Sequence, residues 1–458
     1  MTAGHQRQAA AWFTARCEAL ALDGRVRAES ATVRDIAVQA SEPLRVAVAG
    51  VVSTGKSGLV NALLGTGAAR VARDETTSRI AWYRDPALPV PPPLGEAHDF
   101  EPVDFPLSGK IVLIDTPGLD TVSGNELLTE TMFSAKYPAA GAAGALAYLV
   151  AQLSEVEVGL RWIRRFAALN GGPFELHAGI TILGTKADLY ETGGSAQGST
   201  ESKAGLIDDL REAVEETGGH PVGHVGAMTA TLAALARTEV FSDELLAQIE
   251  LVAGTPELRK AAHGGWPLLE DVAKPSAIAL DVERLSDALG SSLSLASAAD
   301  LLAEQRPADP RAAVRRLWLG MSGLDDLEKQ LSTVAAAGTT LTITAVVRRL
   351  ERLAARLGPN LGEPVRTLLA HWRGDGLSQW HDRHCAALVL EGDELAYLPP
   401  EDRLSAARML RGEGDPLTAP MRARWVKARA GWRVTSRDAK IIRMVLDPFV
   451  QQAGSAGP

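Results

Sequence analysis

The feature that most constrains this chain is an eight-residue loop of the form G-x-x-x-x-G-K-S at residues 50–57. It follows an apolar run at residues 44–49 and precedes a second apolar segment at residues 58–64, which is the order of strand, loop and helix in which such loops bind phosphate. Its glycines let backbone N–H groups converge on a phosphate, Lys56 reaches the terminal phosphate oxygens, and the Ser57 hydroxyl is a ligand for Mg²⁺. The residues expected to contact a bound nucleotide are Gly50, Ser53, Thr54, Gly55, Lys56, Ser57 and Gly58.

A second strand-like run ends in a carboxylate. Residues 110–114 are mostly apolar and β-branched, and D-T-P-G follows at residues 115–118. Asp115 at a strand end can hold Mg²⁺ through water, and the Gly118 N–H can meet the terminal phosphate of a nucleotide. This segment is therefore predicted to sense the γ-phosphate.

A third apolar run, at residues 178–183, leads into T-K-A-D at residues 185–188, which matches the pattern [NT]-K-x-D. The Asp188 carboxylate can accept hydrogen bonds from both N1–H and the exocyclic amine of guanine, whereas adenine offers no such pair of donors. With Thr185 and Lys186, it predicts that GTP and GDP are the ligands. Hydrolysis of GTP is the only chemistry that the sequence supports.

The composition is that of a globular protein large enough for two or three packed regions, with 458 residues of which 46% are hydrophobic. A net charge of −9 argues against a nucleic-acid partner. Cys17 and Cys385 lie in no disulfide or zinc pattern, which favours the cytoplasm. Residues 1–22 do not resemble a signal peptide, and the least polar stretch, residues 138–153, is expected to hold a core strand and is too short to span a bilayer.

Periodicity divides the chain into three parts. Residues 1–43 predict an N-terminal helical segment, interrupted at Asp23 and Gly24. Residues 44–236 carry the three motifs, each at the end of a strand-like run. Residues 237–458 have few strand signals and predict an α-helical bundle. The proline-rich residues 85–93 predict a loop or an edge hairpin.

Two stripes of apolar residues at helical spacing each predict one helix in the C-terminal part. The stripes are formed by Leu317, Met321, Leu324, Leu327 and Leu331, and by Ile343, Val346, Val347, Leu350, Leu353 and Leu357.

His384 and Cys385, also in the C-terminal part, are sequence neighbours that point in different directions on a helix. This favours a packing role over a nucleophile pair.

Residues 403–446 carry eleven basic residues against three acidic ones, a net charge of +8, with Trp425 and Trp432 among them. Two explanations stay open. The segment binds an anionic membrane or an acidic partner, or its basic side chains form a solvated helix face that pairs with acidic neighbours.

On these motifs the chain resembles the translation-factor-related class of P-loop GTPases over about residues 44–236, and within it the bacterial dynamin-like proteins. N-A-L-L-G at residues 61–65, E-T-T-S-R at residues 75–79 and Leu119 directly after D-T-P-G are typical of that family. The run at residues 318–327 is similar to the start of the stalk in the isoniazid-inducible subgroup. The resemblance implies an α/β GTPase domain, with a mostly parallel sheet flanked by helices, and a helical stalk against which the N-terminal segment packs.

The resemblance also implies roles for single residues. Thr77 is the switch threonine that ligates Mg²⁺, with Thr76 as its rival, and the Ala227 N–H donates to guanine O6. Ser53 helps to hold a K⁺ or Na⁺ ion, often completed by a dimer partner. Catalysis is thereby assigned to Lys56, Ser53 and Thr77, and the metal ligands to Ser57, Thr77 and Asp115.

Two residues depart from related enzymes. Leu119 stands where Ras-like enzymes keep a water-orienting glutamine, and Val52 stands where dynamins usually have glutamine. We therefore expect GTP hydrolysis that is slow or depends on dimerisation.

Two functional classes remain. The first is a GTPase that dimerises through its GTPase domain and remodels membranes as a peripheral protein at the inner face of the plasma membrane. The second is a cytosolic regulatory switch whose helices bind a protein partner. A ribosome-assembly GTPase ranks behind both, since we find no basic G-x-x-G RNA-binding loop. Residues 264–269 and 335–347 are the two candidates for a membrane-inserting tip.

Overall fold

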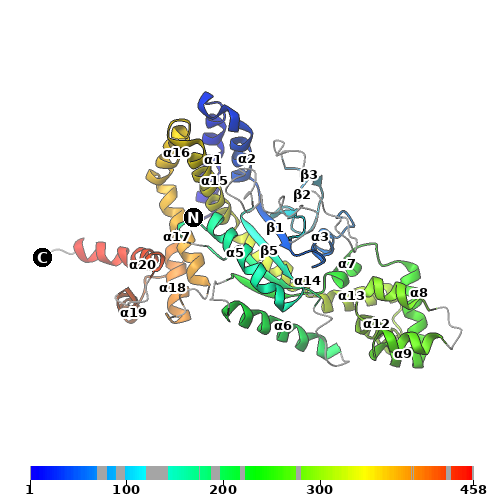
Figure 1. The fold of residues 1–458 in the computed structure, drawn as a ribbon. Coiled ribbons are helices and arrows are strands. Elements are labelled where there is room, and N and C mark those ends of the chain that lie inside the picture. The colour runs from blue at the N-terminus through cyan, green and yellow to red at the C-terminus, as the bar shows by residue number, and fades with distance from the viewer. Residues whose placement is uncertain are drawn as a thin grey trace.

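The chain folds around one central sheet, with helices from both ends of the sequence on one side of the molecule and a further group of helices on the other (Figure 1). The computed structural model describes residues 2–69, 80–88, 98–119, 143–174, 176–186, 196–216, 222–274, 280–392, 395, 397–429 and 435–455.

The sheet has seven strands in the order β3-β2-β4-β1-β5-β6-β7. All neighbouring strands are parallel except β2 and β4, so the prediction of a mostly parallel sheet is confirmed. The central strands are buried along their whole length because helices cover both faces. The strands are β1 (Leu44–Gly50), β2 (Ile80–Arg84), β3 (His98–Pro102), β4 (Ile111–Asp115), β5 (Ala145–Val150), β6 (Ile180–Gly184) and β7 (His224–Ala227).

The proline-rich stretch lies between β2 and the edge strand β3. These two strands pair in parallel, with Ile80 opposite His98. A hairpin joins antiparallel strands only, so β2 and β3 do not form one, and residues 89–93 of the proline-rich stretch lie outside the described residues.

Alternate residues of the strands face two different layers of helices. On one face, Val46 and Val48 of β1 share a core with α3 (Lys56–Leu64) and α7 (Ala230–Arg237). On the other, Ala47 packs in a core with α5 (Val156–Asn170) and α6 (Ala196–Glu216). Two short 3₁₀ helices, η2 (Leu153–Glu155) and η3 (Gly172–Phe174), flank α5.

The two ends of the chain meet in one group of helices. The N-terminal helices α1 (Thr2–Leu20) and α2 (Ser30–Ser41) are joined through η1 (Gly24–Glu29). They share a core with α15 (Gly338–Leu361) and α16 (Glu363–Gly374), where the Trp372 ring lies 5.2 Å from Trp12 and 4.6 Å from Phe13. The break between α1 and η1 falls at the predicted position, and the Asp23 side chain accepts a hydrogen bond there from the backbone N–H of Arg25.

The remaining helices form two further groups, so the C-terminal half is helical but not a single bundle. The first group, called here the helical module, shares a core with α7 and lies to the right in Figure 1. Several helices of the second group pack beside the sheet. The module contains α8 (Asp243–Gly254), α9 (Pro256–His263), α10 (Trp266–Ala273), α11 (Val282–Leu289), α12 (Ser292–Gln305) and α13 (Pro310–Ser322). The second group contains α14 (Leu324–Ala336), α17 (Gly376–Glu391), α18 (Pro400–Arg411), α19 (Ala419–Arg429) and α20 (Ser436–Ser455).

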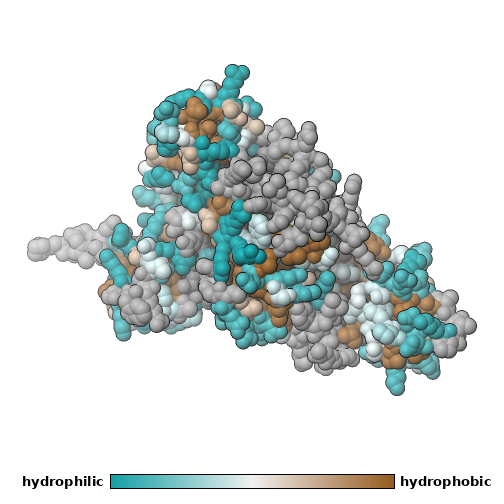
Figure 2. All heavy atoms as spheres, viewed as in Figure 1, coloured by the Kyte–Doolittle hydropathy of each residue, from teal (hydrophilic) through white to brown (hydrophobic). Residues whose placement is uncertain are grey.

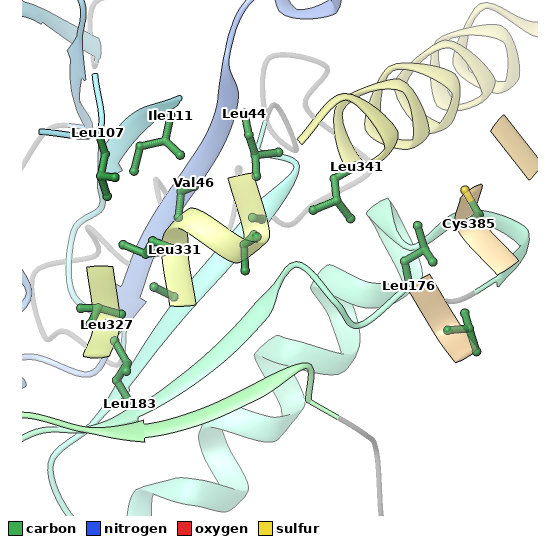
Figure 3. Packing of buried hydrophobic residues seen from close by; sticks show 14 of the residues in the cluster. Leu44, Val46, Leu107, Ile111, Leu176, Leu183, Leu327, Leu331, Leu341 and Cys385 are labelled. Atoms are coloured by element: carbon green, nitrogen blue, oxygen red, sulfur yellow. The ribbon is translucent and has the colours of Figure 1, made fainter. Parts of the chain in front are cut away.

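One of the two apolar stripes lies on one helix, and the other does not. The stripe at residues 343–357 lies on α15, as predicted. The stripe at residues 317–331 is divided at Gly323, whose φ of 79° ends α13. Beyond it, Leu327 and Leu331 of α14 turn to the sheet core beside Val46 (Figure 3). The prediction of one helix over this stripe is therefore wrong.

The two candidate membrane tips differ in exposure. Within residues 335–347, Leu341, Ile343 and Val346 are buried in the core, which excludes an exposed tip there. At the start of α10, Leu268 is 46% exposed. No single helix in the described ranges is long and apolar enough to cross a membrane, and α14 with α15, bent by 62°, meets that test only as a pair.

Candidate functional site

The predicted phosphate loop forms between β1 and α3, in the expected order of strand, loop and helix. A Cβ on Gly50 would lie 2.6 Å from the carbonyl oxygen of Leu149, so only glycine fits there. Gly55 has a φ of 88°, and Ser53 also has a positive φ, of 62°. The Thr54 side chain is buried at the turn. These constraints keep the loop tight against β5.

Lys56 lies folded inside this loop. Its Nζ donates to the carbonyl oxygens of Gly50 and Val51, at 3.1 Å and 2.8 Å. Burial lowers the pKa of Lys56 to about 8. A phosphate oxygen beside this nitrogen favours the charged ammonium, because an opposite charge stabilises it.

Ser57 and Asp115 meet at the carboxyl ends of β1 and β4. The Ser57 hydroxyl donates to Asp115 Oδ2 at 3.1 Å. Asp115 is 2% exposed, its Oδ1 has no hydrogen-bond partner among the described residues, and burial raises its pKa to about 6. A hydroxyl and a buried carboxylate with one unused oxygen fit Mg²⁺, which prefers oxygen ligands and favours the ionised carboxylate. The third expected ligand, Thr77, and its rival Thr76 lie outside the described residues.

The D-T-P-G segment is held against the phosphate loop. The backbone N–H of Leu119 donates to the Gly50 carbonyl at 3.1 Å. A Cβ on Gly118 would lie 2.6 Å from Cγ2 of Val52, so glycine is required at this contact. The Leu119 side chain is fully buried in the core and faces away from solvent. Neither Leu119 nor Val52 carries a polar group that could orient water.

The residues expected to bind the base lie at the ends of β6 and β7. The Thr185 N–H donates to Val150 at 2.8 Å, and Lys186 is exposed with a φ of 57°. The Met228 N–H donates to β6, and backbone N–H groups alternate sides along a strand, so the Ala227 N–H faces away from β6. Asp188 lies outside the described residues. The carboxyl ends of β1, β4, β6 and β7 thus gather the placed site residues at one edge of the sheet.

Sequence reasoning missed one contact of this edge. The backbone N–H of Thr229, just after β7, donates to the carbonyl of Ser322 at 2.8 Å. Ser322 lies at the junction of α13 and α14, where the apolar stripe predicts one continuous helix. The glycine at position 323 was the one signal of a break there.

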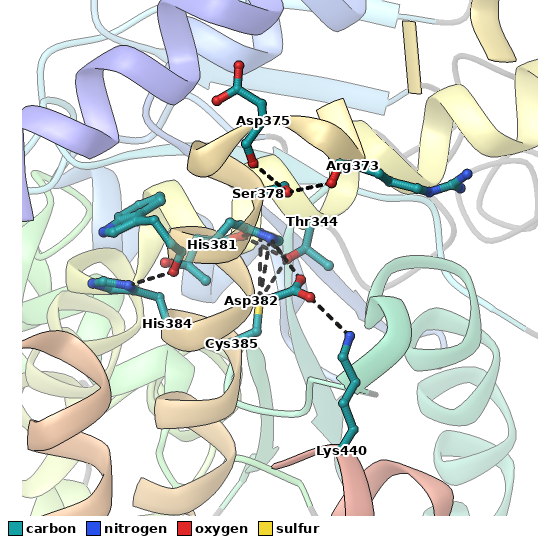
Figure 4. Close-up of polar contacts among 11 residues, drawn as sticks. Thr344, Arg373, Asp375, Ser378, His381, Asp382, His384, Cys385 and Lys440 are labelled. Carbon is teal, nitrogen blue, oxygen red and sulfur yellow. Dashed lines mark hydrogen bonds and ion pairs between the residues drawn. The ribbon is translucent and has the colours of Figure 1, made fainter. Parts of the chain in front are cut away.

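A second polar cluster, between α15 and α17, has no role at this edge (Figure 4). His381 Nε2 lies 3.0 Å from Thr344 Oγ1 and 3.6 Å from Cys385 Sγ. Burial lowers the pKa of His381 to about 4 and raises that of Cys385 to about 12. The neighbouring His384 bonds through Nδ1 to the Trp380 carbonyl at 3.0 Å. Since the thiolate is disfavoured, the expected packing role of His384 and Cys385 fits this geometry.

Known proteins resemble parts of the chain. Residues 45–166 match the family model described as 50S ribosome-binding GTPase. No curated protein matches the chain. Among solved structures, the one described as LeoA bacterial dynamin GTPase from ETEC is 14% identical, with a TM-score of 0.28, and the match covers 99% of this chain and 66% of that one.

Two further matches come from structures described as an oligomerised bacterial dynamin pair that provides a mechanism for the long-range sensing and tethering of membranes. Their identities are 15% and 14%, and their TM-scores are both 0.26. The matches cover 99% of this chain in each case, and 76% and 63% of the other chains.

The fold and the site define the class of protein. A mostly parallel sheet carries a phosphate loop after β1 and a carboxylate at the end of β4, and a GTPase family model matches this part of the chain. The chain is an α/β protein in which a P-loop GTPase domain is joined to an α-helical region.

Proposed function

We propose that this chain is a dynamin-like GTPase that binds GTP and GDP with Mg²⁺ and hydrolyses GTP. The observation that carries the proposal is the hydrogen bond from the half-buried Ser57 hydroxyl to the buried Asp115 carboxylate beside the phosphate loop. Lys56 binds the β- and γ-phosphate oxygens, and the Gly118 N–H meets the γ-phosphate. Ser57 and Asp115 would hold Mg²⁺ here, and the ion would neutralise negative charge on the phosphates.

The test is titration calorimetry with GTP, GDP and ATP in the presence of Mg²⁺. We expect GTP and GDP to bind and ATP not to bind. Lys56→Ala and Ser57→Asn should abolish tight binding of GTP, because the phosphate and metal contacts are lost. Asp188→Asn should weaken GTP binding by about 2–4 kcal/mol, because it breaks a buried polar pairing with guanine. Equal affinities for ATP and GTP would contradict the proposal.

The finer proposal is that GTP drives dimerisation through the GTPase domain and that hydrolysis is slow without it. Leu119 is buried and Val52 packs against Gly118, so another group must activate the water. Ser53 is exposed at the turn of the phosphate loop, where a K⁺ or Na⁺ ion shared with a second copy can be reached.

The proposed site of action is an anionic membrane, to which the protein binds peripherally from the cytoplasm. Support comes from the segment of net charge +8 (residues 403–446), in which Arg408, Lys427, Arg429 and Arg443 are exposed. On the face seen in Figure 2, hydrophobic residues lie in several separate places, so binding through charge is the simpler mode.

Several basic residues of this segment have acidic partners, which favours the second candidate, a cytosolic switch with a protein partner. Arg424 bonds to the buried Asp402 at 2.5 Å, and Arg411 pairs with Glu391. Lys440 pairs with Asp382 at 3.1 Å (Figure 4). Co-sedimentation with anionic vesicles, with and without a non-hydrolysable GTP analogue, separates the two candidates, since only the membrane protein pellets with lipid.

A further inference from the structure

The junction of α13 and α14 lies against the loop that follows β7. We call Ser322 and Gly323 the elbow, and residues 227–229 the base loop. The carbonyl of Ser322 accepts the N–H of Thr229 at 2.8 Å. A Cβ on Gly323 would lie 2.6 Å from the carbonyl oxygen of Ala227 and 3.5 Å from Met228 Cα. The two backbones are therefore in direct contact, with no side chain between them to absorb a shift.

Contacts on both sides fix the backbone conformation of the elbow. The Ser322 hydroxyl accepts the N–H of Leu324, the first residue of α14, at 3.1 Å. Gly323 has a φ of 79°, a conformation that other residues rarely adopt. Beyond the elbow, Glu328 of α14 pairs with Arg237 at the end of α7, at 2.8 Å. The elbow thus contacts the base loop, and the helix after the elbow, α14, is tied to the helix after the base loop, α7.

The base loop also leads directly to the phosphate loop. Ala230, the first residue of α7, lies 3.3 Å from where a Cβ on Gly55 would be and 3.7 Å from one on Gly58. A displacement of the base loop therefore reaches the phosphate side of the site as well.

We propose that the elbow is a positioning element of the guanine site, which holds the base loop where the Ala227 N–H meets O6 of the base. This inference rests on the proposed function. Because the elbow is also the end of the helical module, nucleotide binding and the placement of α13 and α14 are coupled, and the coupling acts in both directions.

The variant that tests the proposal is Gly323→Ala. Its methyl group must displace the Ala227 carbonyl, so we expect GDP to bind about tenfold more weakly, because a small misplacement breaks a directed contact. The readout specific to positioning is the ratio of the affinities for GDP and 6-thio-GDP, in which sulfur replaces O6. The ratio should fall towards one in the variant, since the Ala227 N–H then no longer contacts the atom at position 6, whether oxygen or sulfur.

Two controls separate this effect from others. Gly412→Ala introduces the same backbone strain at a φ of 73°, with nothing within 4 Å of the added Cβ, and should leave both affinities unchanged. Gly320→Ala, on α13 just before the elbow and also with nothing within 4 Å, should do the same. Thermal unfolding shows whether each variant is folded.

A second measurement needs only the wild-type protein. Amide hydrogen exchange with and without GDP should show slower exchange at residues 322–324 as well as in the base loop when GDP is bound. Unchanged exchange at the elbow, or a Gly323→Ala variant that binds GDP and 6-thio-GDP like the wild type, would overturn the elbow proposal. If the wild type binds no GDP at all, the proposed function itself fails.

Discussion

At the scale of single residues, Leu119 and Val52 leave the site without a polar side chain at two positions next to the expected γ-phosphate. Leu119 is fully buried in the core, and Cγ2 of Val52 fills the space that a Cβ on Gly118 would need. Neither side chain can orient an attacking water, which in Ras-like enzymes is the task of a glutamine. We therefore expect that another residue or a second copy of the chain supplies the group that activates the water.

The first prediction concerns the rate of GTP hydrolysis. The rate per molecule should be low, rise with protein concentration, and be higher in K⁺ than without it, through an ion near Ser53. The measurement is phosphate release over a series of protein concentrations in K⁺, in Na⁺ and in neither. A fast rate that is indifferent to concentration and cation would mean that another residue supplies the catalysis.

The second prediction concerns Val52. Val52→Gln places an amide at the position where dynamins usually carry one, so hydrolysis should become faster, by about tenfold or more if the amide orients the water. The affinity for GDP should stay the same, since GDP lacks the reacting phosphate. Steady-state rates and calorimetry check the two parts, and Val52→Leu is the matched control because it adds bulk without a polar group.

At the scale of elements, a buried ionic network joins α2, β1, β2 and α15. Asp35 of α2 pairs with Arg45 of β1 at 2.9 Å and with Arg349 of α15 at 2.8 Å. Glu42 pairs with Arg45 at 2.8 Å and with Arg84 of β2 at 2.6 Å. All five side chains are nearly fully buried. The network fixes the N-terminal helices and α15 to the two strands.

The third prediction concerns the removal of the Asp35 carboxylate from this ionic network. Asp35→Ala should lower the free energy of unfolding by about 3–5 kcal/mol, because two buried arginines lose their shared counter-ion. Asp326→Ala removes an exposed carboxylate that pairs with Lys329 at 3.2 Å and should have little effect. Denaturant titration measures both, and similar losses in the two variants would contradict the argument.

The fourth prediction follows from the pKa of Asp35. Burial alone would raise this pKa, but Arg45 and Arg349 outweigh it and lower the value to about 2. The unfolded value is about 3.9, so the contribution of Asp35 to stability is present above that pH and is lost as the pH falls towards 2. The difference in unfolding free energy between the wild type and Asp35→Asn should therefore shrink between about pH 4 and pH 2. If the difference in unfolding free energy stays constant over that pH range, the proposed contribution of the ionised Asp35 is wrong.

The same scale shows what the sequence could predict. The phosphate loop and Asp115 could be found because each motif is contiguous and its chemistry depends on residue type. Helix α15 could be found because its stripe is unbroken. The end of α13 could not, because Met321 and Leu324 keep helical spacing across Gly323. Nor could the elbow, since Ser322 meets Thr229 through backbone atoms, which leave no signature in residue types.

At the scale of the whole molecule, the candidate site at the sheet edge lies beside the helical module and far from the C-terminal helices (Figure 1). The positive segment (residues 403–446) belongs to those C-terminal helices, so its charge can be changed without touching the nucleotide site. Arg424 must be kept, because its loss leaves Asp402, which is 0% exposed, without this partner. The suitable positions are the exposed Arg408, Lys427, Arg429 and Arg443.

The last prediction concerns these four residues. Each basic side chain near an anionic leaflet contributes about 1 kcal/mol, and the effect fades within a Debye length. The wild type should therefore bind vesicles rich in anionic lipid at low salt, and added salt should release it. Replacement of the four residues by Glu should abolish binding and leave the affinity for GDP unchanged. Vesicle flotation and calorimetry measure the two quantities.

A variant with the same change in net charge elsewhere provides the control. Arg27, Arg34, Lys260 and Arg284 are exposed and lie outside the segment, so their replacement by Glu should weaken binding far less. If both variants lose binding equally, the attraction comes from overall charge and not from this surface. If the wild type floats free of anionic vesicles at low salt in every nucleotide state, membrane action is wrong. The acidic partners of Arg411, Arg424 and Lys440 then make the switch with a protein partner the better account, because part of the positive charge of the segment is neutralised within the fold.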